Sequence, residues 1–142
     1  MLYLAAKITH ILSACVVIGY LVYDIFILRG LKKGRSQEDF TRLKRALLPR
    51  AAAVSGVGFV LLFASGIWLA NFDLGGEWFE LQSRFAKLLW LKISIAFSIL
   101  IFTPFSLFFV LRGKKDPFRQ FYHEIALVIC VSVVVIAKIM LY

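Results

Sequence analysis

Long apolar runs alternate with short polar segments along this chain, and the pattern predicts a protein made of helices. Four runs are largely apolar, at residues 4–28, 51–72, 88–111 and 121–142. Each supplies the roughly 20 residues that a helix needs to cross about 30 Å of hydrocarbon. Because the connections are short, they leave no room for a second domain. The sequence therefore predicts one all-α domain over residues 1–142, an integral membrane bundle of four antiparallel helices.

The composition supports a membrane protein. Hydrophobic residues make up 61% of the chain and the mean hydropathy is +0.86, far above what a soluble domain needs to fill its core. The first apolar run is longer than the roughly 7–15 residues of a signal-peptide core, so we expect it to remain as the first helix. Membrane lipids are the first expected partners.

The net charge of +9 is distributed unevenly between the predicted loops. Basic residues gather in two of them: Arg29, Lys32, Lys33, Arg35, Arg42, Lys44, Arg45 and Arg50 in or beside the first, and Arg112, Lys114, Lys115 and Arg119 in the third. The positive-inside rule then makes these loops cytoplasmic and places both chain termini and the second loop outside an inner (plasma) membrane. The basic excess is a topology signal, so no nucleic-acid partner is expected. Binding of anionic lipids is the alternative to simple solvated charge.

Two local signals mark helix boundaries. Ser36 is followed three residues later by Asp39, which is typical of a helix N-terminus and predicts a short interfacial helix leading into the second span. Gly75 and Gly76 predict a break after that span. One face of the second span is made of small residues except for Leu62, so a neighbouring helix can approach closely. That face consists of Ala51, Ser55, Gly58, Leu62, Ser65 and Gly66.

Ionisable residues inside the apolar runs are the candidates for chemistry. Lys7, His10 and Asp24 fall within roughly 100° of arc on one face of the first helix. A charged side chain at mid-membrane costs about 2.5–3.5 kcal/mol on insertion scales. We therefore expect this face to point into the bundle.

These residues separate into two clusters by depth. Lys7, His10, Lys92 and Lys138 are expected within roughly two turns of the outer surface. With no intramembrane acid nearby, this outer cluster predicts an anionic cofactor, a lipid or substrate anion, or an acidic partner protein. Snorkelling of Lys7 and Lys138 to the interface is the alternative. The expected inner cluster consists of Asp24, Arg50, His123 and Glu124.

Asp24 and Arg50 are predicted to form an ion pair, with His123 or Glu124 attached. A proton relay is the alternative for this inner cluster.

His10 has two interpretations. It can hydrogen-bond across helices, or it can be an axial ligand of a b-type haem whose propionates are matched by the three lysines of the outer cluster. His123 lies roughly 20 Å from His10 along the predicted bundle axis, too far for both to bind one iron. Cys15 and Cys130 predict ordinary packing rather than a copper site.

The opening run KITHILSACVVIGYLVY resembles the first span of the HemJ and CopD-like families of small membrane proteins, with matches at Lys7, His10, Gly19 and Tyr23. GIWLA in the second span, LWLK in the third and VVVIAK in the fourth are similar to HemJ in order and spacing. The resemblance implies haem b bound through His10 and a functional, catalytic lysine at Lys92. For HemJ itself it implies oxidation of protoporphyrinogen IX to protoporphyrin IX, with electrons passed to the quinone pool.

The chain departs from HemJ-like sequences at three places. Those sequences carry a tryptophan in the first span, an arginine near its inner end and a histidine late in the third span, where this chain has Val17, Asp24 and FTPFSL. A haem-binding relative that is not an oxidase is therefore an alternative, and the CopD branch adds copper transport. A further alternative is a non-catalytic interaction subunit of a membrane complex, or a homo-oligomer.

Overall fold

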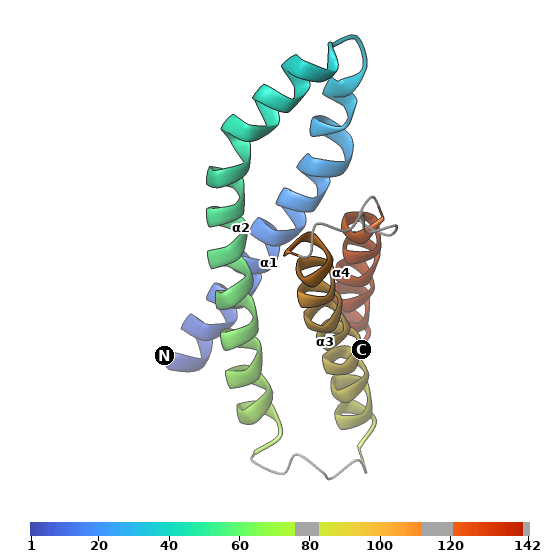
Figure 1. Cartoon of the computed structure of the whole chain (residues 1–142). Helices are drawn as coiled ribbons and strands as arrows, with labels where there is room; N and C mark the ends of the chain where they lie inside the picture. Colours follow the sequence, from blue (N-terminus) through green and yellow to red (C-terminus); the bar gives the residue numbers. More distant parts are fainter. Residues whose placement is uncertain (76–82, 112–120, 141–142) are drawn as a thin grey trace. The chain divides into compact units, whose positions relative to one another are not determined.

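The computed structural model describes residues 1–75, 83–111 and 121–140, and every element in these ranges is helical. The all-helical prediction is thus confirmed for the described chain, and each of the four predicted runs coincides with a long helix (Figure 1). The elements are α1 (Leu2–Val22), the π-helix η1 (Tyr23–Leu28), the 3-10 turn η2 (Gly30–Lys32), α2 (Gln37–Asp73), α3 (Arg84–Leu111) and α4 (Tyr122–Ile139).

Three helical segments in the described chain are long and apolar enough to cross a membrane: Leu2–Lys32, Gln37–Asp73 and Tyr122–Ile139. The run at 88–111 is helical as part of α3, and its membrane crossing stays a prediction. The chain divides into two compact units, Met1–Trp78 and Phe79–Tyr142. The single bundle of all four helices and the sidedness of the loops also stay predictions.

In the first unit, α1 and α2 pack as an antiparallel pair. The Tyr3 hydroxyl near the start of α1 donates to Asp73 Oδ1 at the end of α2 over 3.1 Å. Small residues bring the two backbones together, because a Cβ added at Gly58 would lie 2.9 Å from Val16 Cγ1. Gly58 and Ser65 are buried. The close helix approach predicted for the small-residue face is therefore confirmed at these positions.

The connection between α1 and α2 begins with a widened helical turn. The Arg29 N–H donates to the Asp24 carbonyl oxygen, five residues back, over 3.2 Å. This pattern defines a π-helix, which inserts an extra residue into the turn. Gly34 then adopts φ +84°, a left-handed conformation that suits glycine and reverses the chain.

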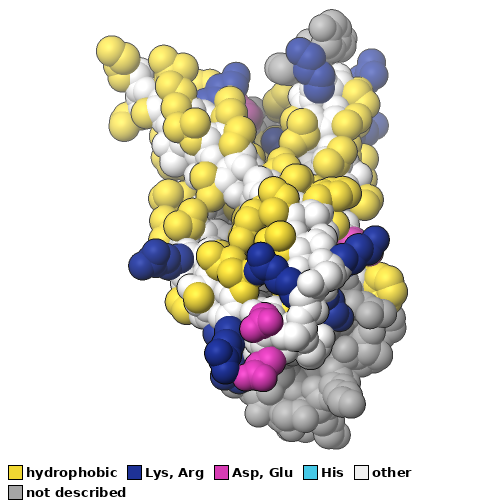
Figure 2. Space-filling model, turned by 90° about the horizontal axis from the view of Figure 1, so that it is seen from above, with side chains coloured by type: hydrophobic (Ala, Val, Ile, Leu, Met, Phe, Trp, Pro, Cys, Tyr) yellow, Lys and Arg dark blue, Asp and Glu magenta, His cyan; other side chains and the backbone are white. Residues whose placement is uncertain are grey.

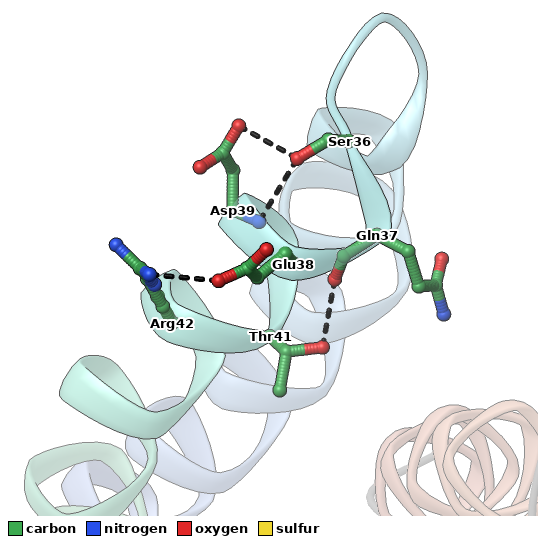
Figure 3. Close-up of polar contacts among 6 residues, drawn as sticks. All are labelled: Ser36, Gln37, Glu38, Asp39, Thr41 and Arg42. Atoms are coloured by element: carbon green, nitrogen blue, oxygen red, sulfur yellow. Dashed lines mark hydrogen bonds and ion pairs between the residues drawn. The ribbon is translucent and has the colours of Figure 1, made fainter.

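The N-terminus of α2 is capped as the sequence predicts. Ser36 Oγ accepts the Asp39 N–H over 3.1 Å (Figure 3), satisfying one of the unpaired donors of the first turn. The helix then continues through Pro49 to Asp73. The helix predicted to begin after Ser36 and lead into the second span is thus the first part of α2, and its position at a membrane interface stays a prediction.

The C-terminus of α2 lies at the predicted glycine break. Gly75 has φ +58° and its N–H donates to the Phe72 carbonyl over 3.2 Å, a common way to end a helix. Gly76 lies outside the described residues.

In the second unit, the end of α4 lies beside the start of α3. Ala86 and Leu89 are buried on α3. A hollow of about 220 Å³ is lined by residues of both helices: Arg84, Phe85, Leu88, Ile139 and Met140. The two helices are therefore antiparallel.

Candidate functional site

His10 faces α2 and contacts it through its Nδ1. Its Nδ1 lies 3.0 Å from the Leu62 carbonyl oxygen and 3.1 Å from Ser65 Oγ. A carbonyl oxygen can only accept, so in the neutral ring Nδ1 carries the proton and donates it to Leu62. The lone pair of the ring then lies on Nε2, which is the nitrogen able to bind a metal.

The buried Ser65 hydroxyl supports this tautomer. It donates to the Leu61 carbonyl over 2.6 Å and also lies 3.1 Å from the Leu62 carbonyl. Because its hydrogen is directed to these backbone oxygens, its oxygen is left to accept the N–H of His10. The contact with the Leu62 carbonyl therefore assigns the proton of the neutral ring to Nδ1, and the Ser65 hydroxyl is compatible with that tautomer.

Gly66 makes room for the imidazole against α2. A Cβ added at this glycine would lie 3.1 Å from His10 Cε1 and 3.5 Å from His10 Nδ1. The first distance is shorter than ordinary van der Waals contact. A side chain at position 66 would therefore require the ring to shift by a few tenths of an ångström.

Lys7 lies beside one member of an aromatic group at the same end of the α1 and α2 pair. The exposed Lys7 Nζ lies 5.8 Å from the centroid of the Tyr3 ring, within the range of a cation–π contact. The Tyr3 and Phe72 centroids are 4.8 Å apart, and Trp68 stacks on Phe72 at 5.9 Å. Through the Tyr3 hydroxyl, this group also reaches the carboxylate of Asp73.

The other two lysines of the predicted outer cluster lie in the second unit. Lys92 is half-buried on α3, and Lys138 is exposed in the last turn of α4. The structure thus brings Lys7 and His10 onto one helix, while Lys92 and Lys138 belong to a pair of antiparallel helices. A single cluster of all four stays a prediction.

The predicted inner residues are divided in the same way. Asp24 is buried in η1 and Arg50 is exposed on α2. His123 and Glu124 are half-buried in the first turn of α4, where the carboxylate complements the helix dipole. The ion pair between Asp24 and Arg50, and the alternative of a proton relay, stay predictions.

Within the described ranges, no group of three or more His, Cys, Asp or Glu side chains is placed to hold a metal ion. Cys15 and Cys130 are free thiols. A haem differs from a bare metal ion, because the porphyrin supplies four nitrogen ligands and the protein needs to add only one or two.

Comparison of the chain with protein-family models, with curated proteins and with solved structures finds no match. The resemblance to the HemJ and CopD-like families therefore stays a prediction, resting on the short motifs around His10 and Lys92.

The partners of His10 were not predicted from the sequence. Ser65 and Gly66 were assigned to close helix packing alone, although a serine within a row of small residues is a signal for a polar contact. The register in which α1 packs on α2 places Ser65 and Gly66 beside His10. The sequence pattern does not specify this register.

Proposed function

We propose that this chain is a membrane protein that binds a b-type haem, with His10 as an axial ligand, and that it serves redox chemistry with a porphyrin or a quinone. The observation that carries the proposal is the hydrogen bond from His10 Nδ1 to the Leu62 carbonyl. Histidines that bind metals usually donate their other ring N–H to a carbonyl or carboxylate, which fixes the tautomer and makes the ligating nitrogen more basic.

The surroundings of His10 fit such a ligand. Leu62 and Ser65 restrain the direction of the ring, and Gly66 lets it pack against the α2 backbone. A ligand held in one orientation needs little rearrangement to bind. A bound haem would supply one-electron redox chemistry.

The lysines have proposed roles in the same site. Lys7, Lys92 and Lys138 are cations on three helices and would match the haem carboxylates. For a HemJ-like oxidation of protoporphyrinogen IX, Lys92 is the proposed catalytic residue, supported by the LWLK motif and its half-buried position. The proposed location is the inner membrane, with the first and third loops in the cytoplasm, and the apolar length of three helices supports membrane insertion.

The absorption spectrum of the purified chain tests the proposal. Protein expressed with adequate haem supply should show a Soret band, and pyridine haemochrome analysis should identify haem b. His10→Ala should abolish the band. His123→Ala, the matched change at the other histidine of the chain, should preserve it. A wild-type protein without a Soret band, or a His10→Ala variant that keeps it, would refute the proposal.

A non-catalytic interaction subunit is the second candidate, and one observation favours it. The bonds of His10 to Leu62 and Ser65 are also the bonds that a histidine joining two helices would make. This alternative predicts no cofactor in the wild type and co-purification with stoichiometric partners. His10→Ala should then lower the resistance of the chain to unfolding without any spectral change.

A further inference from the structure

We infer that the connection between α1 and α2 is a docking surface for an acidic segment of a water-soluble protein. We call this surface, residues 29–50, the basic tip. The inference depends on the helices crossing a membrane but not on haem. The basic tip carries eight Lys or Arg residues and two acidic residues, a formal excess of six positive charges. Figure 2 views the molecule from this end and shows Lys and Arg side chains beside the few acidic ones.

Both acidic residues of the basic tip make local contacts (Figure 3). Asp39 Oδ2 accepts from Ser36 Oγ over 2.7 Å, and Glu38 pairs with Arg42 over 2.7 Å. The acids therefore serve the first turn of α2, where Glu38 offsets the charge of Arg42 by direct contact. Lys32, Lys33, Arg35 and Arg45 are exposed on the same surface.

The length of α2 carries the basic tip away from the bilayer. The helix has 37 residues and is thus about 56 Å long, whereas a bilayer with its headgroups is about 40–45 Å thick. Trp68 and Phe72 mark the opposite interface, since such aromatic residues are enriched at the membrane surface. Counting about 20 residues back from Phe72 reaches the inner edge of the hydrocarbon. The 14 residues from 37 to 50 then extend about 21 Å further.

The first helix gives the same result through its contact with the end of α2. Tyr3 contacts Phe72 and Asp73, so it lies at the same depth as the end of α2. About 20 residues later the hydrocarbon ends near Tyr23. Lys32 and Lys33 follow at about 14 Å beyond that edge, whereas the headgroup layer is only about 5–8 Å deep. These lysines therefore stand in the aqueous phase.

An acidic protein segment fits this surface better than lipid or nucleic acid. The lipid phosphates lie about 8 Å below Lys32 and Lys33, a distance close to the Debye length at physiological salt. The attraction between these two lysines and the phosphates is therefore mostly screened. An exposed apolar side chain lies next to these cations in the chain, since Leu31 directly precedes Lys32 and Lys33 and is 37% exposed. A protein segment with both carboxylates and apolar residues would complement charge and apolar surface together, whereas a phosphate backbone would match only the charge.

Binding of a labelled oligoglutamate peptide to the full chain tests the inference. The chain is placed in nanodiscs of neutral phosphatidylcholine, which leave both faces accessible, and binding is followed by fluorescence anisotropy. The expected result is binding that weakens with salt. Lys32→Glu with Lys33→Glu should weaken it by about two- to thirtyfold, since each exposed ion pair contributes about 0.2–1 kcal/mol. Arg84→Glu with Lys87→Glu reverses two exposed cations at the start of α3 and should leave binding intact.

Two further arms distinguish the other occupants. In nanodiscs with phosphatidylglycerol, wild type should still bind the peptide more tightly than the Lys32→Glu, Lys33→Glu variant. Equal peptide binding by the two proteins in these nanodiscs would show that lipid covers the basic tip. Lys32→Gln with Lys33→Gln should give an intermediate loss and keeps the test decisive if the glutamate variant misfolds. The inference would be overturned if the Arg84→Glu, Lys87→Glu control lost as much peptide binding as the Lys32→Glu, Lys33→Glu variant. Peptide binding that does not weaken with added salt would also overturn it.

Discussion

Replacing Gly58 by alanine tests the packing of α1 on α2. The added Cβ would lie 2.9 Å from Val16 Cγ1, 3.4 Å from Val16 Cβ and 3.6 Å from Val17 Cγ2. Valine has one strongly preferred rotamer in a helix, so it does not swing away cheaply. The two helices must therefore separate by a few tenths of an ångström, which loosens the contacts on either side.

A matched glycine on the same helix isolates this effect. Gly56 has nothing within 4 Å of its added Cβ. Alanine favours a helix over glycine by up to about 1 kcal/mol at either position, whereas overpacking costs about 1–3 kcal/mol at Gly58 alone. Because the helix preference cancels in the comparison, Gly58→Ala should be about 1–3 kcal/mol less stable than Gly56→Ala.

The assay is unfolding of the purified chain in detergent by added sodium dodecyl sulfate, followed by circular dichroism. Combining Gly58→Ala with Val16→Ala removes the clash, so the double variant should recover part of the loss, and the double-mutant cycle should show coupling. Equal free energies of unfolding for Gly58→Ala and Gly56→Ala would refute the packing described here.

Three other substitutions test single contacts. Ser65→Ala removes a hydrogen-bond partner of His10 and should lower the free energy of unfolding by about 0.5–1.5 kcal/mol in the same titration. An unchanged value would exclude the contact. Ser36→Ala removes the cap of α2 and should lower the free energy of unfolding by about 1 kcal/mol. Amide hydrogen exchange in the first turn of α2 should become faster, and unchanged exchange would contradict the capping. Gly75→Ala forces alanine into φ +58° and should destabilise the folded chain by about 1–2 kcal/mol. Gly30→Ala should not destabilise it, because Gly30 has open space and no positive φ. Equal unfolding midpoints for the two variants would argue against the left-handed turn.

The helices could be predicted because their signals are local. Each apolar run is long enough to form a helix of membrane-spanning length by itself, and each of the four runs overlaps one of the helices α1 to α4. The cap at Ser36 and the break at Gly75 depend on only a few neighbouring residues, and both are present. Such features follow from backbone hydrogen bonding and conformational preference, which act over one helical turn.

The features that sequence reasoning missed depend on partners distant in the chain or on small energy differences. The π-helix of Tyr23–Leu28 has no apolar or polar signature that separates it from the α-helix before it. The passage of α2 through Pro49 shows that a long helix tolerates the loss of one hydrogen bond. The contacts of His10 with Leu62 and Ser65 span more than fifty residues and require the register of two helices.

Rescue of a His10→Gly variant by free imidazole tests the haem proposal most directly. The substitution removes the ring that contacts Leu62 and Ser65 and leaves a space of its own size. We expect His10→Gly to lack the Soret band of the wild type, added imidazole with haemin to restore it saturably, and His123→Gly to need no imidazole. A His10→Gly protein that keeps the wild-type spectrum without imidazole would contradict His10 as the axial ligand.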